Sequence, residues 1–230
     1  MKNSQAGSHP CEHRLQSLYL FKPEGCMPTL LLIRHGENDY LTKNKLPGRI
    51  PGIHLNRRGQ EQAAELTRTL TGLPIKAIYS SPLERAIETA EPLAKSLGLG
   101  IQLLPDLTDT DVGNWAGHSW KMLGRTRFWK IIQQAPSQFQ FPGGETFVQA
   151  QERVVNTLDA LAASHADELV AVVFHADPIK LAVAHYLGLP LDHFQRLNAR
   201  TGSVTILKID NHTAKLLALN LIPPFPFEIE

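Results

Sequence analysis

The segment LLLIRHG at residues 30–36 constrains the fold of this chain most strongly, because a short apolar run ends abruptly in two basic side chains and a glycine. A continuous apolar run of this length is typical of a strand that is buried on both faces. The segment LVAVVF at 169–174 has the same character, and IKAIYS at 75–80 also fits a strand. Strands buried on both faces belong to parallel sheets that are covered by helices on both sides.

Segments rich in helix-forming residues separate these strands. One is RRGQEQAAELTRTLT at 57–71. Further helices are expected at 81–98, 146–163 and 178–187. Two of them are predicted to begin with a capping box, formed by Ser81 with Glu84 and by Thr146 with Gln149. The alternation predicts an α/β fold, a three-layer α/β/α sandwich with a central, mostly parallel sheet.

Three additional strands are expected at 101–104, 203–209 and 214–219. The first is predicted to lie at a sheet edge, and the last two to form a closing hairpin around Asp210 and Asn211. Residues 105–145 are less regular and contain all three tryptophans. A long insert of this kind often forms the lid or wall of a binding site.

The length of 230 residues fits one domain, which is expected to span residues 28–230. Residues 1–27 lack periodicity and are expected to be a poorly ordered N-terminal extension without a signal peptide. Both cysteines, Cys11 and Cys26, lie in this extension, which suits a protein of the reducing cytoplasm.

The charge balance argues against nucleic acid as a partner. The chain has 23 basic and 22 acidic residues, for a formal net charge of +1, and no run of lysines or arginines. Nucleic-acid-binding proteins usually show a basic excess. No apolar run approaches the roughly 18 residues of a membrane span, so no membrane partner is expected. A small molecule is the expected partner, and the sequence gives no indication of oligomeric state.

Unusual side chains follow the three core strands of the predicted sheet. Arg34, His35 and Gly36 follow the first strand, Arg85 lies shortly after the second, and His175 directly follows the third. Ligands of open α/β sheets bind at the carboxyl ends of the strands, where parallel strands bring these residues to one rim. The sequence therefore predicts a site that contains two arginines and two histidines.

This combination suits a phosphoryl group. Arginine donates two parallel hydrogen bonds to phosphate oxygens, and Arg85 gains from the positive end of its helix. Gly36 is expected to let the backbone approach the anion closely. A neutral histidine is a competent nucleophile towards phosphorus, and a second histidine, if protonated, stabilises charge on the transferring oxygens.

Each of these residues taken alone also fits an ordinary structural role, and the convergence of the strand ends favours a site. Of the ten histidines, His175 directly follows the apolar strand at 169–174, and His35 follows the apolar strand at 30–33 after one residue, Arg34. His54 and His118 lie in loops near the expected rim. Glu37 and Glu145 are further acids to which no catalytic role is assigned.

At these residues the chain resembles the histidine phosphatase superfamily, which has the phosphoglycerate-mutase-like fold. The resemblance spans roughly residues 28–210, and the phosphomutase-like branch of the family is the most similar. The matching motifs, in chain order, are RHGE at 34–37, GRIPGIHL at 48–55, SSPLERA at 80–86, LTDTDVGNWAG at 107–117, FPGGET at 141–146 and VVFH at 172–175.

The resemblance implies a role for each matching residue. His35 corresponds to the nucleophile that forms a phosphohistidine, and Arg34, Arg85 and His175 correspond to phosphoryl-binding residues. The family's acid is usually a glutamate, and Asp109 stands at that position. It is one methylene shorter, so either the loop moves inward or Asp111 shares its work. The resemblance implies no metal and no cofactor.

A second departure from the family pattern is Leu41, which stands where the family often has an asparagine that touches phosphate. Substrate specificity is expected to come from residues 43–56 and 105–145. Candidate substrate contacts are Asn38, Arg49, His54 and Trp115. Trp115 is the tryptophan expected nearest the site, although a packing role fits the tryptophans better.

Three functions remain open at this point. The favoured one is a metal-independent phosphatase that hydrolyses a small phosphomonoester through a phosphohistidine. A phosphomutase uses the same covalent step and returns the phosphoryl group to a bound substrate. A phospho-ligand binder with low activity is the third alternative, motivated by Asp109 and Leu41.

Overall fold

The computed structural model describes residues 28–209 and 213–225. The predicted extension at 1–27 and the hairpin turn at Asp210 and Asn211 lie outside the described residues. In the described part, no helix has both the length and the apolar character needed to cross a membrane.

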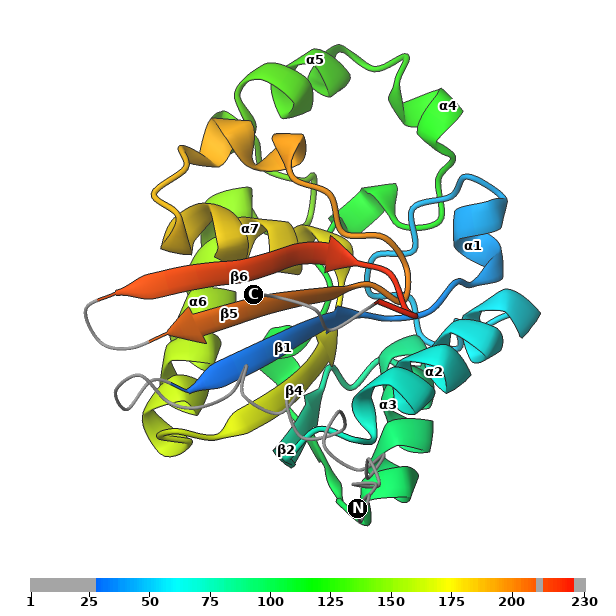
Figure 1. Ribbon diagram of the computed structural model, residues 1–230. Helices are drawn as coiled ribbons and strands as arrows, with labels where there is room; N and C mark the ends of the chain where they lie inside the picture. The colour runs from blue at the N-terminus through cyan, green and yellow to red at the C-terminus, as the bar shows by residue number, and fades with distance from the viewer. Residues whose placement is uncertain (1–27, 210–212, 226–230) are drawn as a thin grey trace, which may run out of the picture.

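A six-stranded mixed sheet forms the middle layer, with the order β3-β2-β4-β1-β5-β6 (Figure 1). The strands are β1 (Thr29–Arg34), β2 (Ile75–Ser80), β3 (Ile101–Leu103), β4 (Leu169–Phe174), β5 (Val204–Ile209) and β6 (Ala214–Leu221). The first four run parallel, whereas β5 and β6 pair antiparallel. All six expected strands are present, and β3 lies at an edge as predicted.

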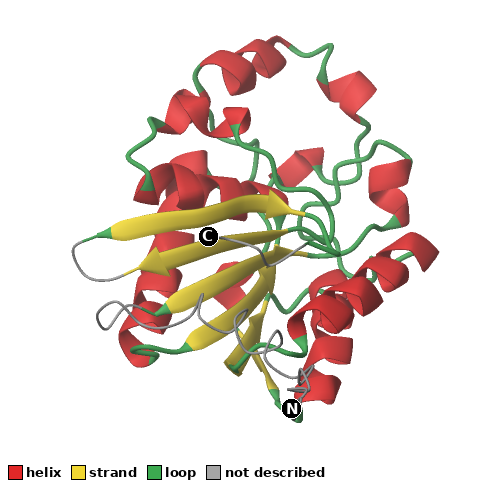
Figure 2. Cartoon of the chain, in the orientation of Figure 1, coloured by secondary structure: helices red, strands yellow, loops and turns green. Residues whose placement is uncertain are grey.

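Helices cover both faces of the sheet, so the predicted three-layer sandwich is confirmed (Figures 1 and 2). The α-helices are α1 (Asp39–Thr42), α2 (Arg57–Leu70), α3 (Glu84–Leu97), α4 (Trp120–Leu123), α5 (Arg127–Gln134), α6 (Phe147–Ser164) and α7 (Ala176–Tyr186). The α2 and α3 helices pack on one face, and α6 and α7 pack on the other.

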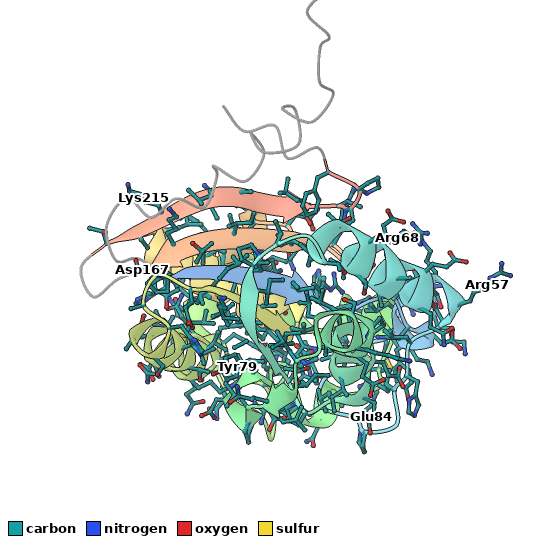
Figure 3. All side chains as sticks on the ribbon, turned by 60° about the horizontal axis from the view of Figure 1, so that its bottom comes forward. Arg57, Arg68, Tyr79, Glu84, Asp167 and Lys215 are labelled. Atoms are coloured by element: carbon teal, nitrogen blue, oxygen red, sulfur yellow. The ribbon has the colours of Figure 1, made fainter. Side chains whose placement is uncertain are left out.

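Alternating side chains of the central strands supply both cores. Leu30 and Leu32 of β1 pack towards α6 and α7, whereas Leu31 and Ile33 pack towards α2 and α3. All four are at most 1% exposed. A strand buried on both faces must be apolar at every position, which explains the continuous apolar run. With all side chains drawn, charged residues such as Arg57 and Lys215 lie on the outside (Figure 3).

The helix starts were predicted with mixed success. The capping box at Thr146 and Gln149 is present. The one predicted at Ser81 and Glu84 is wrong, because α3 begins at Glu84 and its N-cap is Leu83, without a side-chain cap. Ser81 remains extended instead, and its N–H donates to the carbonyl of Val173 at 2.9 Å.

The irregular segment 105–145 forms a third, smaller cluster beyond the end of the sheet. Its short helices are α4, α5, η3 (Pro105–Leu107), η4 (Gly113–Trp115) and η5 (Pro136–Gln138), and η6 (Leu191–Arg196) contributes to the same cluster. Aromatic side chains fill this cluster, among them Trp115, Phe139 and Phe141. The segment is therefore a packed wall rather than an open loop.

Candidate active site

The register of the parallel strands brings the predicted residues together. Arg34 at the end of β1 is paired with Phe174 at the end of β4. The N–H of His35 donates to the carbonyl of Phe174 at 3.0 Å, so that His35 and His175 leave the sheet side by side. Their ring centroids lie 5.1 Å apart. The predicted rim is confirmed as a place in the fold.

The ring of His35 has one nitrogen committed to the backbone. Nδ1 lies 2.7 Å from the carbonyl oxygen of Gly36. A carbonyl oxygen only accepts hydrogen bonds, so Nδ1 carries the proton and Nε2 keeps its lone pair. Burial, the charge of Arg85 and the charge of Arg34 lower the pKa of His35 well below its ordinary value. The ring is therefore neutral near pH 7 and presents Nε2 as a nucleophile.

Ser81 is the hydrogen-bond partner of one ring nitrogen of His175. Its Oγ accepts from the N–H of Leu83 at 3.3 Å and lies 2.8 Å from Nε2 of His175. The hydroxyl hydrogen can then donate to Nε2, which leaves the proton of His175 on Nδ1. Burial and the charge of Arg85 lower the pKa of His175 well below its ordinary value. The ring of His175 is therefore neutral near pH 7 in the unliganded site, and with its proton on Nδ1 it presents that nitrogen as a donor to a bound oxyanion.

The two arginines are fixed by backbone carbonyls. Nη2 of Arg85 donates to Gly48 at 2.7 Å, and Nη1 of Arg34 donates to Ala199 at 2.7 Å. Arg85 is fully buried and lies in the first turn of α3, as predicted. Burial lowers the pKa of both guanidinium groups, which nevertheless stay protonated because an arginine is not deprotonated in proteins.

Several buried nitrogen atoms at the rim have no hydrogen-bond partner among residues 28–209 and 213–225. They are Arg34 Nε, Arg85 Nε, Arg85 Nη1 and His175 Nδ1. Buried polar groups are almost always paired, and leaving one unpaired costs about 1–3 kcal/mol. All four are donors on or beside cationic groups, so the ligand that satisfies them best is an oxyanion such as phosphate.

Asp109 reaches into the same site from the irregular segment. Its Oδ2 lies 3.2 Å from Nη2 of Arg85 and 3.7 Å from Nδ1 of His175. Its Oδ1 accepts from the N–H of Thr110 at 2.9 Å. Burial raises the pKa of Asp109, against the opposing charge of Arg85. A carboxyl group with a raised pKa is suited to donating and accepting protons.

A network of side chains that the sequence did not reveal holds Asp109 in place. The Asp109 carbonyl accepts from Nε of Arg49 at 2.8 Å and from Nη2 of Arg153 at 3.1 Å. Both arginines also pair with Glu145, at 3.2 Å and 2.8 Å. We call this network of Arg49, Asp109, Glu145 and Arg153 the strap. It lets the loop lie far enough inward for a short aspartate to reach the rim.

Glu145 is thus a structural anchor, a role that the sequence did not indicate. Burial opposes its ionisation, but the hydrogen bonds and charge of Arg153 lower its pKa. Asp111 does not share the position of Asp109. Its Oδ1 accepts from Gly113 at 3.0 Å, and its Oδ2 lies 3.7 Å from Arg49.

The structure gives Gly36 a packing role in addition to the predicted one. A Cβ at this position would lie 2.6 Å from the carbonyl oxygen of Gly59, and a Cβ on Gly59 would lie 2.1 Å from that of Glu37. The two glycines therefore allow the start of α2 to pack directly on the catalytic loop. The structural reason for Gly36 is backbone packing, and it applies whether or not the loop approaches an anion.

Of the candidate substrate contacts, most already have structural partners. Oδ1 of Asn38 caps α1 by accepting from Tyr40 and Leu41, whereas its Nδ2 is buried without a hydrogen-bond partner in the described part of the chain and stays a candidate donor to substrate. His54 is exposed and pairs with Glu88 on α3, which raises the pKa of His54. Trp115 is buried in the aromatic cluster of the irregular segment, so the structure favours packing over substrate contact.

Arg49 belongs to the strap, and its side chain is 36% exposed.

No group of three or more histidine, cysteine, aspartate or glutamate residues in the described part of the chain is arranged to hold a metal ion.

A cavity of about 490 Å³ lies beside Arg34, outside the two segments from which specificity was expected. Its lining includes Leu41 and Thr42, but also Arg58 at the start of α2 and Arg200 in the loop before β5. Nothing in the sequence signalled these two arginines, because neither follows a strand end and each has an ordinary polar context.

Comparisons with known proteins give a consistent result. The sequence model of the histidine phosphatase superfamily (branch 1) matches residues 30–222. Phosphoserine phosphatase 1 of Hydrogenobacter thermophilus is 27% identical over 201 residues, which cover 85% of this chain and 93% of that protein. The 2,3-bisphosphoglycerate-dependent phosphoglycerate mutase of Thermoplasma acidophilum is 28% identical over 197 residues, covering 85% and 94%.

Solved structures agree with the sequence comparisons. The structure of Bacillus stearothermophilus YhfR superimposes with a TM-score of 0.78 at 27% identity, covering 83% of this chain and 96% of that one. The mycobacterial glucosyl-3-phosphoglycerate phosphatase Rv2419c, in complex with VO3, gives a TM-score of 0.76 at 26% identity, with coverages of 84% and 98%.

Proposed function

This chain belongs to the histidine phosphatase superfamily, and on that premise we propose that it is a metal-independent phosphatase of small phosphomonoesters that works through a phosphohistidine on His35. One observation carries the proposal. No hydrogen bond engages Nε2 of His35 among the described residues, and this nitrogen shares its rim with four unpaired nitrogens and with the carboxyl group of Asp109.

The first step is binding of the phosphoryl group. Arg34 and Arg85 donate from their unpaired nitrogens, and His175 donates from Nδ1. The incoming dianion competes with Asp109 for Arg85, because Asp109 contacts Nη2 of that arginine. Once phosphate neutralises Arg85, the carboxylate loses its counter-charge and gains a negative neighbour. Both changes raise the pKa of Asp109 further and favour its protonated form.

Phosphoryl transfer then follows. Nε2 of His35 forms a bond to phosphorus while the bond to the ester oxygen breaks, and Asp109 gives its proton to the departing alkoxide. The arginines and His175 stabilise the charge on the transferring oxygens, a contribution that is typically about 10²–10³ in rate for each donor. The products of this step are an alcohol, a phosphohistidine and an ionised Asp109.

Hydrolysis restores the enzyme. Ionised Asp109 accepts a proton from water, whose oxygen attacks phosphorus as the bond to Nε2 breaks. The lone pair returns to His35, and inorganic phosphate leaves. The hydrogen bond from Nδ1 to Gly36 keeps the ring orientation fixed throughout.

A panel of small phosphomonoesters, including an aryl phosphate, tests the proposal with wild-type protein and His35→Ala. We expect hydrolysis by the wild type that persists in excess EDTA and falls by about 10⁴-fold or more in the variant, as for removal of other catalytic nucleophiles. Absence of hydrolysis of every ester by the folded wild type would rule out the phosphatase.

A phosphomutase is the second candidate, and the similarity to the Thermoplasma acidophilum mutase favours it specifically. The two activities share the covalent step and differ in whether water or a bound hydroxyl group accepts the phosphoryl group. A phosphoglycerate mutase assay, with and without a bisphosphorylated primer, separates them. If primer-dependent isomerisation of phosphoglycerate is faster than phosphate release, the protein is a mutase and not a phosphatase.

A further inference from the structure

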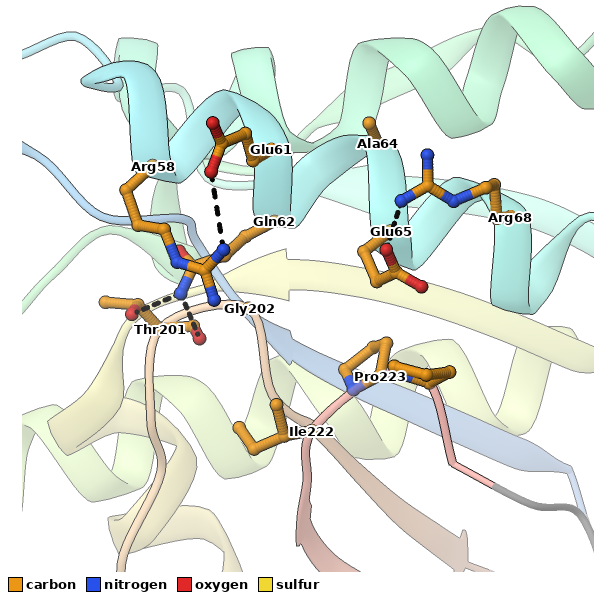
Figure 4. A pocket seen from close by; sticks show the side chains of 11 residues that line it. Arg58, Glu61, Gln62, Ala64, Glu65, Arg68, Thr201, Gly202, Ile222 and Pro223 are labelled. Carbon is orange, nitrogen blue, oxygen red and sulfur yellow. Dashed lines mark hydrogen bonds and ion pairs between the residues drawn. The ribbon is translucent and has the colours of Figure 1, made fainter.

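The cavity beside Arg34 continues as a groove along α2. A second cavity of about 450 Å³ shares four lining residues with it. The shared residues are Arg58, Gln62, Thr201 and Ile222. Figure 4 shows this outer part, with Arg58 above Gln62 and Thr201 and with Ile222 on the opposite side. Arg34 is the residue that the inner cavity shares with the reacting site, since it lines the cavity and its unpaired Nε lies at the rim.

The inner cavity is strongly basic. Arg34, Arg58 and Arg200 line it, and Glu37 is the one carboxylate in its lining. Glu37 is engaged elsewhere, since its Oε1 accepts from Nδ2 of Asn56 at 3.0 Å. A cavity with such an excess of guanidinium groups attracts an anion.

Arg58 and Arg200 have few acidic partners to compensate their charge. Arg58 contacts Glu61 at 3.4 Å, but the side chains are 62% and 49% exposed, and such pairs contribute little. Among the described residues, the hydrogen bonds of Arg200 involve its backbone, and its guanidinium group makes no hydrogen bond or ion pair. Both groups are therefore available to a ligand.

The loop that carries Arg200 is built rigidly on the catalytic strand. The N–H of Gly202 donates to the carbonyl of Arg34 at 3.1 Å, and Arg34 donates back to Ala199. Nε2 of Gln62 holds Thr201 through its carbonyl and its hydroxyl oxygen, at 3.1 Å and 3.0 Å. A side chain placed on such a loop is preorganised relative to the reacting phosphate, and preorganisation favours binding.

The backbone N–H of Arg200 is also committed, since it donates to Oδ1 of Asn220 at 2.6 Å. The position of the residue thus depends on its backbone and not on its side chain. Replacing the side chain should leave the loop in place, which makes Arg200 suitable for mutagenesis.

We propose that Arg58 and Arg200 form a second oxyanion subsite, which binds a carboxylate or a further phosphate on the leaving-group portion of the substrate. The subsite rests on the proposed function, because the reacting phosphate is placed at His35. It names the substrate class as phosphomonoesters that carry a second negative group. Arginine suits both oxyanions, because its planar fork matches either group bidentately.

Binding to the His35→Ala variant tests the subsite independently of turnover. Calorimetry compares three ligands of similar size, namely 3-phosphoglycerate, glycerol 1,3-bisphosphate and glycerol 3-phosphate. In 3-phosphoglycerate a carboxylate replaces the terminal hydroxymethyl group of glycerol 3-phosphate, and in glycerol 1,3-bisphosphate the terminal hydroxyl group is phosphorylated. We expect the preferred doubly anionic ligand to bind at least about 10-fold more tightly than glycerol 3-phosphate. Comparing the affinities for 3-phosphoglycerate and glycerol 1,3-bisphosphate shows whether the subsite prefers a carboxylate or a phosphate.

Variants in the His35→Ala background assign the effect to residues. Arg200→Ala should remove most of the preference, and Arg200→Lys should restore part of it because the charge returns. Arg57→Ala is the matched control, since Arg57 precedes Arg58 on α2, is 93% exposed and points away from the molecule (Figure 3). We expect that control to leave all three affinities unchanged.

Equal affinities for the three ligands would overturn the subsite, and so would an equal loss of preference in Arg57→Ala and Arg200→Ala. Neither result depends on hydrolysis. If the wild-type chain hydrolyses glycerol 3-phosphate as well as the two doubly anionic esters, the proposed phosphatase activity is supported and the proposed subsite is contradicted. If a doubly anionic ligand binds more tightly but the wild type hydrolyses none of the esters, the proposed subsite is supported and the proposed phosphatase activity is contradicted.

Discussion

The two sides of the candidate site are held by different kinds of interaction. His35 and His175 extend directly from buried parallel strands: the N–H of His35 donates to the carbonyl of Phe174, and the carbonyl of His175 accepts from the N–H of Ile179 at the start of α7. Asp109 lies in an irregular segment, and side chains of the strap hold its backbone. Sheet geometry survives the loss of any one side chain, whereas the strap does not. The nucleophile is therefore robust in position, and the acid depends on individual ion pairs.

The largest effect is expected on the sheet side. Arg85→Ala removes two of the unpaired donors and the cation next to Asp109. We expect kcat/KM for an aryl phosphate to fall by about 10³-fold, because a donor to the transferring oxygens is lost. Circular dichroism and thermal melting show whether the variant is folded. A folded variant that keeps more than a tenth of the activity would mean that Arg85 does not bind the phosphoryl group.

The next prediction concerns the strap. Arg153→Ala removes the contacts of that arginine with Glu145 and with the carbonyl of Asp109. Displacement of the acid by about 1 Å costs about 10²-fold in rate, and we expect a loss of that size in kcat with little change in KM. Glu152→Ala, at an exposed neighbouring position on α6, is the control. Equal activities of the two variants would show that the strap does not position the acid.

A smaller effect is expected when the acid itself is lengthened. Asp109 already lies 3.2 Å from Arg85, so the additional methylene of Asp109→Glu pushes the carboxyl group into the phosphate position. Because misplacement by about 1 Å costs about 10²-fold, we expect a loss of about 10-fold after partial relaxation. A gain in rate would instead mean that the natural acid is too short, which would favour the phospho-ligand binder.

The two sides also differ in how well the sequence predicts them. The apolar runs before His35 and His175 identify buried parallel strands, and the topology then places both histidines at one rim. Arg85 follows from the same reasoning, although the helix start before it was misplaced. Ser81 forms an apparent capping box with Glu84, but its N–H bonds to Val173 of β4 and its hydroxyl group contacts His175.

The strap and the basic cavity could not be predicted in this way. Arg153 lies in the middle of α6, and Arg58 and Arg200 lie in polar surroundings, so no periodicity or motif distinguishes them. Their positions depend on how the irregular segment and the loop before β5 pack, which is a tertiary property. Resemblance to a family suggested Asp109, but only the geometry shows how a short side chain reaches the rim.

The smallest effect concerns acid stability. Burial and the charges of Arg85 and Arg34 lower the pKa of His35, and burial, Arg85 and His35 lower that of His175. Below about pH 6.5 the unfolded chain binds protons at these positions whereas the folded chain does not. The free energy of unfolding is therefore retained above that pH and decreases below it. The decrease is up to about 1.4 kcal/mol per pH unit for each histidine, and it stops at the lowered pKa of the folded state.

Urea denaturation between pH 5 and pH 8 (a range that brackets about 6.5) measures this dependence. The double variant His35→Gln with His175→Gln should lose less stability on acidification than the wild type. His185→Gln on α7, outside the site, is the control. If the stability of the double variant depends on pH as strongly as that of the wild type, His35 and His175 are not buried in their neutral form.

The most direct test of the account is to trap the phosphoryl group on His35. Wild-type protein is mixed with a ³²P-labelled phosphomonoester, quenched within one turnover, and mapped by mass spectrometry. The account predicts an acid-labile, alkali-stable label on Nε2 of His35 that decays at the rate of phosphate release and is absent from His35→Ala. Hydrolysis without such a label, or a label on another residue, would contradict it.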